Sequence, residues 1–281
     1  MMAGTLYLVA TPIGNLEDIT HRAVRVLREA GLIACEDTRR TRKLLSHYGI
    51  HAAVVSCHEH NEARRSEELL GRLRAGVSVA LVSDAGTPLV SDPGYRLVNR
   101  AIQEGIRVEP VPGPSALLAA LAASGMPAGE FYFAGFLPAK GAQRRRALER
   151  LKQVDATLVF YEAPHRILET LADIEAVLGP RPLALGREIT KIHEEFLRGA
   201  PAGLKEILKT RPSIKGEMTL VVGRPERKDA DFGPLAEAVA ACERGGMTRM
   251  DAIKAVARQR GLAKREVYRV CGGHAAAPPS E

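Results

Sequence analysis

The chain lacks tryptophan altogether, and aromatic residues are only 4% of its 281 residues, although 46% are hydrophobic. Its core must therefore be built mainly from Val, Leu, Ile and Ala. The four cysteines include no CxxC pair, so neither a disulfide framework nor a cysteine metal site is predicted. We expect no metal ion, and we expect the reducing cytoplasm as the location.

Long apolar runs are also missing: none approaches the roughly 20 residues that a membrane helix needs, so no membrane association is predicted. The apolar start of the chain has no basic segment before it and ends at Pro12, which favours a first strand over a signal peptide. The loop after this strand is not G-x-G-x-x-G, so the usual dinucleotide fingerprint is absent. No internal repeat of solenoid period is found.

Charge is unevenly distributed. The net charge is +7, and between Arg244 and Arg269 eight Lys and Arg residues stand against two acidic ones. A basic cluster of this kind favours a polyanionic partner such as nucleic acid, while a solvated basic surface explains it equally well.

Strand and helix signals alternate through the first 223 residues, which predicts α/β structure with a largely parallel sheet covered by helices. The predicted strands are 5–10, 32–35, 54–56, 77–82, 106–111, 131–136, 157–161, 183–185 and 218–222. The predicted helices are 20–30, 38–48, 61–75, 91–104, 115–123, 142–153, 164–178 and 202–209. A proline-rich break near residue 112 suggests two α/β domains, 1–118 and 119–225.

A third unit is predicted at 232–271, after a polar linker at 224–231. Apolar residues recur at helical spacing from Phe232 to Cys242, Thr248 and Asp251 form a capping-box-like start, and 264–270 suggests a third helix. This pattern indicates a small basic bundle of helix-turn-helix character. A helical cap on the body or on a twin subunit is the alternative. The Ala- and Pro-rich tail, 272–281, is expected to be disordered.

The most informative loop follows the buried strand 77–82. Asp84 at the strand end offers a carboxylate to a ribose or an ammonium, and Ala85-Gly86 lets a ligand approach bare backbone. We expect Ser91 to cap the next helix. Two Ser-Asp pairs within ten residues exceed what one turn needs, so a ligand site at this edge of the sheet is favoured.

Three further loops of the first domain have a similar character. The first is 11–15 (TPIGN), which taken alone is an ordinary turn. The second is 35–40 (CEDTRR), where helix capping explains the acids as well as a proton-handling role does. The third, 110–116, is either an interdomain linker or part of a cleft.

In the second domain, Glu162 and His165 follow a strand and are acid-base candidates, although a lone histidine at a helix start is more often structural. Arg187 and Lys191 follow the next strand and add two cations. The basic run 140–146 is either solvated surface or a phosphate-binding segment.

Read in order, seven motifs resemble the tetrapyrrole-type class of S-adenosylmethionine (SAM)-dependent methyltransferases, and within it the subgroup of ribosomal RNA small subunit methyltransferase I. They are 6–15 (LYLVATPIGN), 35–39 (CEDTR), 82–88 (VSDAGTP), 91–94 (SDPG), 112–116 (PGPSA), 161–166 (YEAPHR) and 187–191 (REITK). The wider class usually has V-G-x-G-P-G in its first loop. The departure here argues against a porphyrinoid substrate.

The resemblance implies two α/β domains with SAM in the cleft between them, a small basic helical domain, and a homodimer. It implies 2′-O-methylation of the ribose of a cytidine in the decoding region of small-subunit (16S) RNA, either free or in the assembled 30S subunit. The cofactor-binding residues that it implies are Pro12, Gly14, Asp84, Ala85, Gly86, Thr87, Ser115, Ala116 and Tyr161.

Methyl transfer from a sulfonium needs alignment and a base for the hydroxyl proton. The candidate bases are Asp37 and Glu162, followed by Glu36 and His165. The candidates for holding RNA are Arg39, Arg40, Arg166, Arg187 and Lys191. A carbon methylase of tetrapyrrole precursors and a non-catalytic RNA-binding assembly factor are the alternatives.

Overall fold

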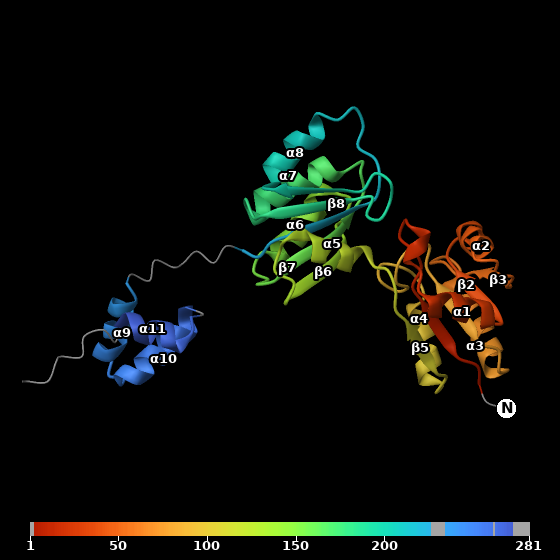
Figure 1. The fold of residues 1–281 in the computed structure, drawn as a ribbon, viewed down its shortest axis with the longest axis horizontal. Coiled ribbons are helices and arrows are strands. Elements are labelled where there is room, and N and C mark those ends of the chain that lie inside the picture. The colour runs from red at the N-terminus through yellow and green to blue at the C-terminus, as the bar shows by residue number, and fades with distance from the viewer. Residues whose placement is uncertain (1–2, 226–233, 261, 272–281) are drawn as a thin grey trace, which may run out of the picture. The chain divides into compact units, whose positions relative to one another are not determined.

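The computed structural model describes residues 3–225, 234–260 and 262–271. The chain divides into two compact units, residues 1–225 and 226–281. The first unit contains two five-stranded sheets, each covered by its own helices, and the second contains helices (Figure 1).

The first sheet has the order β3-β2-β4-β1-β5, and every neighbouring pair is parallel. Its strands are β1 (Leu6–Val9), β2 (Leu32–Cys35), β3 (Val54–Ser56), β4 (Val79–Val82) and β5 (Val108–Val111). Its helices are α1 (His21–Glu29), α2 (Thr38–His47), α3 (Glu62–Arg74) and α4 (Tyr95–Gln103), with a 3-10 turn, η1 (Leu16–Asp18). The predicted parallel sheet is confirmed for this domain.

Helices cover both faces of the first sheet. Alternate strand residues such as Val9 and Ala80 pack against α1 and α2, and their neighbours Leu6 and Val79 pack against α3 and α4. Since successive side chains of a strand point to opposite faces, a strand buried on both sides must be apolar throughout. This explains the uninterrupted apolar run of β4.

The second sheet, whose strand order the sequence left open, is mixed rather than parallel. Its order is β6-β7-β10-β8-β9; only β6 and β7 are parallel, and every other neighbouring pair is antiparallel. Its strands are β6 (Phe131–Phe136), β7 (Thr157–Glu162), β8 (Leu183–Arg187), β9 (Glu195–Gly199) and β10 (Met218–Val222). Strand β9 was not predicted, because a half-buried edge strand with polar ends gives a weak pattern.

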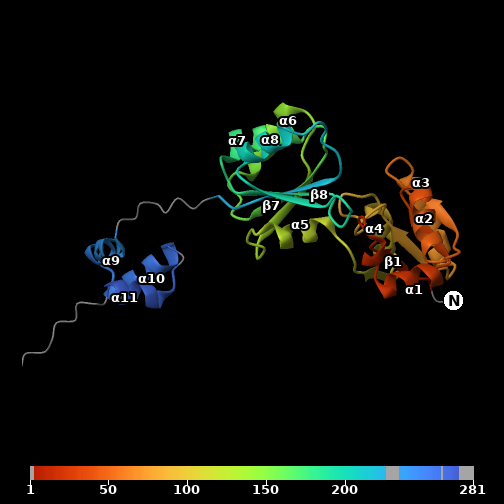
Figure 2. The same ribbon diagram turned by 45° about the horizontal axis from the view of Figure 1, so that its top comes forward.

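Helices also cover both faces of the second sheet (Figure 2). One face carries α6 (Gly141–Leu151), α7 (Ile167–Leu178) and α8 (Pro201–Lys209), and the other carries α5 (Ala116–Ser124). Helix α5 packs on the second sheet and so belongs with it. The change from the first sheet to the second therefore comes before residue 116, a few residues ahead of the predicted division after residue 118. Ile13, from the loop after β1, joins the same apolar cluster as α5 and connects the two layers.

Helix α4 begins at Tyr95 and not at Ser91, which corrects the predicted capping role of that serine. Ser91 has a φ of 70°, and the N-cap is Gly94. The free amides of this helix are satisfied from α3 instead, because Glu62 Oε1 accepts hydrogen bonds from the Gly94 and Arg96 amides at 3.1 and 2.9 Å. Residues 89–94 therefore form a loop rather than the first turn of a helix.

The second unit contains α9 (Leu235–Arg244), α10 (Arg249–Arg260) and α11 (Lys264–Cys271) around a small core that includes Val239, Ile253 and Val267. The predicted cap is present: Thr248 Oγ1 accepts from the Asp251 amide at 3.3 Å and donates to its carboxylate at 2.8 Å. The predicted helix start at Phe232, the linker beyond residue 225 and the tail at 272–281 lie outside the described residues. None of the helices described here combines the length and apolar character needed to cross a bilayer.

Candidate cofactor and catalytic site

The loops after β1 and β4 are joined at the carboxyl edge of the first sheet. The amide of Thr11 donates to the Gly86 carbonyl and the amide of Gly86 donates to the Thr11 carbonyl, both at 2.9 Å. The carboxyl edge of a parallel sheet is where ligands bind in open α/β folds.

The loops after β2 and β5 are tied to the same place. Asp84 Oδ1 accepts the Asp37 amide at 3.0 Å, and its other oxygen lies 3.4 Å from an Arg40 nitrogen. Thr87 Oγ1 donates to the Pro114 carbonyl at 3.4 Å. Four loops from distant parts of the sequence thus form one surface.

The second sheet presents a facing edge made of the ends of β7 and β8 and the start of β10. Because β10 is antiparallel to both neighbours, its first residue, Met218, lies opposite Glu162 at the end of β7 and opposite Arg187 at the end of β8. The chain direction of β10 therefore brings residues 216–219 to the site.

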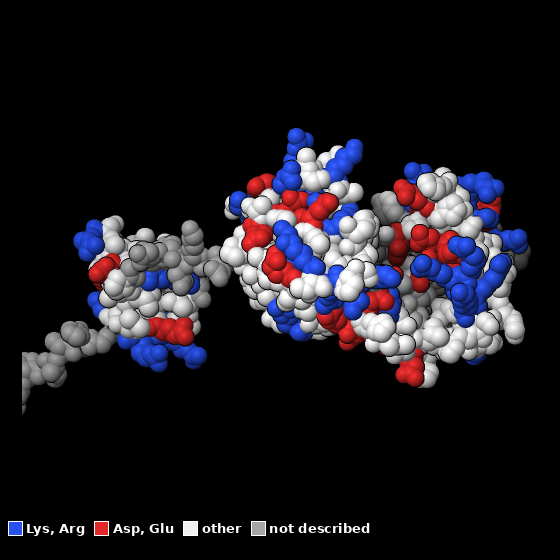
Figure 3. Space-filling model, turned by 90° about the horizontal axis from the view of Figure 1, so that it is seen from above, with Lys and Arg blue, Asp and Glu red and all other residues white. Residues whose placement is uncertain are grey.

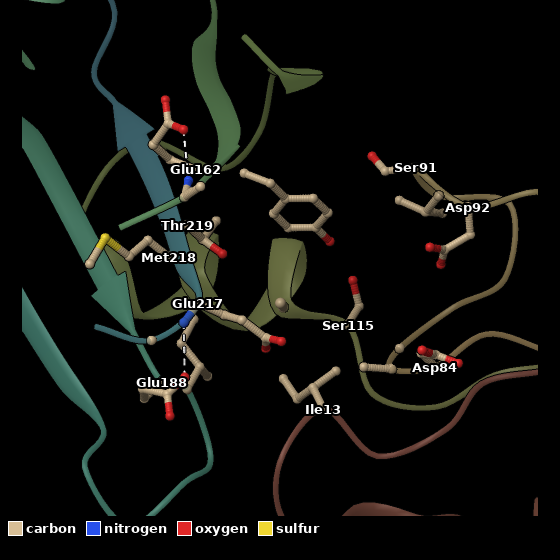
Figure 4. A pocket seen from close by; sticks show the side chains of 18 of the residues that line it. Ile13, Asp84, Ser91, Asp92, Ser115, Glu162, Glu188, Glu217, Met218 and Thr219 are labelled. Atoms are coloured by element: carbon tan, nitrogen blue, oxygen red, sulfur yellow. Dashed lines mark hydrogen bonds between the residues drawn. The ribbon is translucent and has the colours of Figure 1, made fainter. Parts of the chain in front are cut away.

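Between these edges lies a cavity of about 790 Å³, within the range of small-molecule and cofactor sites (Figure 4). Ile13, Asp84, Ser91, Asp92 and Ser115 lie on one side of it, and Glu162, Glu188, Glu217, Met218 and Thr219 on the other. Its remaining lining residues are Glu36, Arg40, Ala85, Gly86, Thr87, Val90, Ala116, Phe136, Tyr161, Ala163, Pro164, Ile189, Lys191 and Gly216.

Backbone strain is concentrated around this cavity. Four non-glycine residues in the described part of the chain have a positive φ: Leu89, Ser91, Glu188 and Thr190. Ser91 and Glu188 line the cavity, and the other two are each next to a lining residue. Such conformations cost about 1–3 kcal/mol each and persist where the surroundings enforce them, commonly at functional sites.

On the second-sheet side, Glu162 is fully engaged within the protein. Its side chain is inaccessible to solvent; Oε1 accepts from the Ala163 amide at 2.7 Å and from the Arg166 guanidinium, and Oε2 accepts from Thr170 Oγ1 at 2.6 Å. The carboxylate points away from the cavity (Figure 4). Glu162 therefore holds Arg166 and the start of α7, which argues against its predicted role as a base.

The other two carboxylates on that side share one cation. Lys191 Nζ lies 2.8 Å from Glu188 Oε1 and 3.0 Å from Glu217 Oε2. The hydrogen bond from Lys191 lowers the pKa of Glu188. The loop after β1 passes close by: a Cβ on Gly14 would lie 2.4 Å from Lys191 Cγ, so only glycine permits this approach.

On the first-sheet side, the carboxylates are in a different state. Burial, followed by the negative charge of Glu36, raises the pKa of Asp92 to about 6. Burial and the charge of Asp84 also raise the pKa of Glu36. This side of the cavity therefore holds a carboxyl group that titrates close to neutrality, which is the property expected of a general base.

Most of the predicted cofactor residues come together in the cavity lining: Asp84, Ala85, Gly86, Thr87, Ser115, Ala116 and Tyr161. Pro12 and Gly14 are not in the lining, whereas Ile13 between them is. Ser115 also caps α5, because its side chain accepts the Leu118 amide at 3.4 Å. Burial raises the pKa of Tyr161, so its hydroxyl remains protonated and available as a donor.

The predicted catalytic residues are divided. Glu36 lines the cavity, but Asp37 and His165 do not. Asp37 caps α2 and accepts hydrogen bonds from Arg39, which lower its pKa. An acid so strongly stabilised as the anion is a poor proton acceptor. His165 is exposed. Asp37 and His165 therefore lie outside the cavity, contrary to their prediction as bases.

The predicted RNA-binding residues are divided in the same way. Arg39 is 86% exposed and Arg40 is 63% exposed, and Arg40 also lines the cavity. Arg166 is bound to Glu162, Arg187 lies 3.0 Å from Glu195, and Lys191 bridges two carboxylates. These three cations are engaged in ion pairs within the protein, and their RNA-binding role stays a prediction.

Sequence reasoning missed several lining residues, chiefly Asp92 as a base candidate, Phe136, and residues 216–219. Asp92 carried a signal, because it belongs to the second of the two Ser-Asp pairs. Residues 216–219 carried none, since their place depends on the antiparallel direction of β10.

Comparison with known proteins follows this geometry. Residues 5–204 match the family described as Tetrapyrrole (Corrin/Porphyrin) Methylases. The chain is similar to the ribosomal RNA small subunit methyltransferase I of Halalkalibacterium halodurans, with 49% identity over 95% of this chain and 94% of that protein. The protein of the same name from Mesorhizobium japonicum is 50% identical over 94% of this chain and 90% of its own length.

Among solved structures, the fold is similar to that of uroporphyrin-III C-methyltransferase from Thermus thermophilus, which was crystallised with S-adenosyl homocysteine. The TM-score is 0.56 and the identity is 22%, over 78% of this chain and 97% of that one. At this identity the likeness establishes the fold alone, and it confirms the predicted fold class.

Proposed function

Because the chain belongs to the tetrapyrrole methylase family, we propose that it transfers a methyl group from SAM to the RNA of the small ribosomal subunit. The observation that carries this proposal is identity near 50% over nearly the whole chain with proteins named for that activity. The family assignment makes the chain a methyltransferase, and the relatives identify the substrate class.

The lining residues suit SAM. When bound, SAM supplies a methyl group on a positively charged sulfur. Its ammonium and sulfonium need an acidic partner, which Asp84 offers, and its ribose diol needs a carboxylate or a hydroxyl. Ile13 and Ile189 provide apolar surface for the adenine. Ala85 and Gly86 add backbone groups that a ligand can approach closely.

An RNA substrate needs cations that are free to bind phosphates. Helix α2 carries four exposed basic side chains, Arg39, Arg40, Arg42 and Lys43, beside the cavity-lining loop after β2. Arg39 and Arg40 are paired with Asp37 and Asp84, whereas Arg42 and Lys43 form no salt bridge within the described residues. Figure 3 shows Lys and Arg side chains gathered over part of the same domain. The helical unit adds basic residues on α10 and α11.

The finer assignment is methylation of the 2′-oxygen of a cytidine ribose in the decoding region. It is supported by the resemblance of the first loop, Thr11-Pro-Ile-Gly14, to that of the ribosomal subgroup. The active form is proposed to be a homodimer. Exposed apolar side chains such as Phe131, Tyr132 and Leu118 support a self-associating surface. The cytoplasmic location stays a prediction.

The experiment is transfer of radiolabelled methyl from SAM to small ribosomal subunits taken from a host that lacks this gene, followed by nuclease mapping of the label. We expect label in one ribose of the small-subunit RNA. Free RNA and assembled subunits are compared as substrates, and light scattering reports whether the protein is a dimer.

Two results would contradict the proposal. SAM binding without label on RNA would favour the carbon methylase of tetrapyrrole precursors. Salt-sensitive RNA binding without SAM binding would favour a non-catalytic assembly factor, because phosphate contacts release counterions but need no methyl donor.

Asp84→Arg tests the position of the cofactor within this proposal. The variant places a cation where the cavity now offers a carboxylate, so we expect SAM binding to be lost. The protein should still fold, with a lower melting temperature because the contacts of Asp84 with the Asp37 amide and Arg40 are lost. Retained SAM affinity, measured by titration calorimetry, would move the cofactor elsewhere.

A further inference from the structure

We propose that Asp92 is the catalytic base, the group that accepts the proton of the attacking hydroxyl. The inference deepens the proposed function and rests on it. It does not depend on which nucleotide is modified, because any hydroxyl nucleophile must lose its proton as it is methylated.

The position of Asp92 is suited to this role. It lies in the loop between β4 and α4, and its carboxylate points into the cavity from the first-sheet side (Figure 4). Leu89 and Ser91, just before it, have φ values of 73° and 70°. The loop is therefore strained. Residues 91–94 do not form the first turn of α4 that the sequence predicted, and the Asp92 side chain points into the cavity instead.

Asp92 differs from most other acids of the cavity in having no cation beside it. Asp84 is paired with Arg40, Glu162 with Arg166, and Glu188 and Glu217 with Lys191. Within the described residues, no salt bridge involves Asp92. A proton acceptor must have a free lone pair, and a nearby ammonium or guanidinium would weaken its basicity.

Its surroundings shift the titration of Asp92 in the direction that a base requires. The acidic neighbours Glu36 and Asp84 and the Tyr161 hydroxyl face it, and the Ser83 hydroxyl is the one group that lowers its pKa. Burial and Glu36 raise this pKa to about 6. Asp92 is thus ionised at neutral pH and still more basic than an ordinary carboxylate.

Glu36 is the remaining acid of the cavity without a salt bridge in the described residues. Its side chain is on the exposed rim, and the positive charge of Arg40 acts against its raised pKa. The more enclosed Asp92 is therefore the better acceptor. The role of Glu36 is to increase the basicity of Asp92 through its charge.

The proposed step is balanced. The hydroxyl O–H bond breaks, its proton passes to an Asp92 oxygen, and the hydroxyl oxygen forms a new O–CH₃ bond. The S–CH₃ bond breaks, and its electron pair stays on sulfur, which becomes a neutral thioether. Asp92 then releases the proton to solvent, so no oxidant, reductant or metal takes part.

The test compares single-turnover methyl transfer to small subunits across pH for the wild type, Asp92→Asn and Asp92→Glu. Glu206→Gln on α8, a carboxyl-to-amide change at an exposed position, serves as the control. SAM affinity and melting temperature are measured for each protein, so that loss of folding or of cofactor binding is seen separately from loss of the chemical step.

We expect Asp92→Asn to bind SAM within about twofold of the wild type and to react about 10²–10³ times more slowly, the usual effect of losing a general base. The wild-type rate should fall about tenfold per pH unit below pH 6, and this decline should be absent in Asp92→Asn and kept in Asp92→Glu.

Three results separate the possible failures. An Asp92→Asn rate within about twofold of the wild type would overturn the assignment of the base and leave the methyltransferase intact. Loss of SAM binding in Asp92→Asn would make Asp92 a cofactor ligand and overturn the assignment as well. Absence of methyl transfer by the wild type, with SAM bound, would instead reject the proposed function.

Discussion

The two sides of the cavity carry the same kinds of residue in largely different states, although Asp84 on the first-sheet side is paired with Arg40. On the second-sheet side, Glu162, Glu188 and Glu217 are each paired with a cation. On the first-sheet side, Glu36 and Asp92 form no salt bridge in the described residues, and their pKa values are raised. Neutralised acids stabilise a structure, whereas a partly buried acid without a cation, such as Asp92, is costly and available for chemistry.

The basic residues follow the same division. Arg166, Arg187 and Lys191 on the second-sheet side are engaged in ion pairs, while Arg42 and Lys43 on α2 are exposed and form no salt bridge within the described residues. The comparison indicates that the second sheet supplies a rigid wall and that the first sheet supplies the reactive and substrate-binding groups. Each of the following changes tests one side of that division.

The largest effect is expected from Glu162→Ala. This change leaves the largely buried Arg166 guanidinium without its carboxylate, and breaking a buried ion pair costs about 3–5 kcal/mol. Urea unfolding should show a loss of that size. Glu206→Gln, at an exposed ion pair, should change stability by less than about 1 kcal/mol. A similar small loss in both variants would contradict the structural role of Glu162.

A smaller effect is expected from Gly216→Ala. Gly216 has a φ of 96°, and a Cβ there would lie 2.4 Å from Glu188 Cγ, so Glu188 must move away from Lys191. Gly105 is the matched control, because its φ is 68° and nothing lies within 4 Å of its added Cβ. Both alanine variants should lose about 1 kcal/mol from backbone strain.

Only Gly216→Ala should lose more than this and bind SAM more weakly, as measured by calorimetry. Equal stability and equal SAM affinity for the two alanine variants would show that the position of Glu188 is unimportant to the cavity.

Asp92→Asn should stabilise the protein. A carboxyl whose pKa is raised from 3.8 in the unfolded chain to about 6 in the folded one is destabilising when ionised. The cost is absent below pH 4, grows between pH 4 and 6, and is complete above pH 6. After allowance for solvent screening, we expect Asp92→Asn to gain about 1 kcal/mol at pH 8.

The same gain should be almost absent at pH 3, which is below the pKa of Asp92 in both the folded and the unfolded wild type. Thermal unfolding at the two pH values measures it. A gain that does not depend on pH would mean that the titration of Asp92 is not its source.

The smallest effect of a single substitution is expected on the salt dependence of RNA binding. Arg42→Gln and Lys43→Gln should each reduce the slope of log affinity against log salt by about 0.7–0.9 if the side chain contacts a phosphate. Lys209→Gln on α8 is the control, since that lysine is paired with Glu206. Fluorescence titration at several salt concentrations gives the slopes, and equal slopes for all three variants would remove α2 from the RNA surface.

The parallel half of the fold was predictable because its information is local. An uninterrupted apolar strand such as β4, followed by a loop rich in Gly, Pro and Asp, indicates both a buried strand and its carboxyl edge. Since all five strands run the same way, the loops that carry Glu36, Asp84 and Ser115 must meet at one edge. A ligand site at this edge followed from that reasoning, whereas the identity of the cofactor came from the family resemblance.

The second half was less predictable because its pairing is not local. The antiparallel direction of β10, which brings residues 216–219 into the cavity, leaves no trace in their sequence. Charged residues also gave no sign of their state. Glu162 was predicted as a base and Arg166 as an RNA-binding residue, but they are four residues apart and form a buried ion pair. Asp92 looked like part of a helix cap, and only the strained loop reveals it as a cavity residue.

The most direct test of the division between the two sides is an NMR titration of side-chain carboxyl carbons in protein labelled with ¹³C on aspartate and glutamate. The Asp92 resonance, assigned by its loss in Asp92→Asn, should titrate near pH 6, and Glu188 should titrate below the usual range for glutamate. An Asp92 that titrates near pH 4, like an ordinary aspartate, would contradict the account.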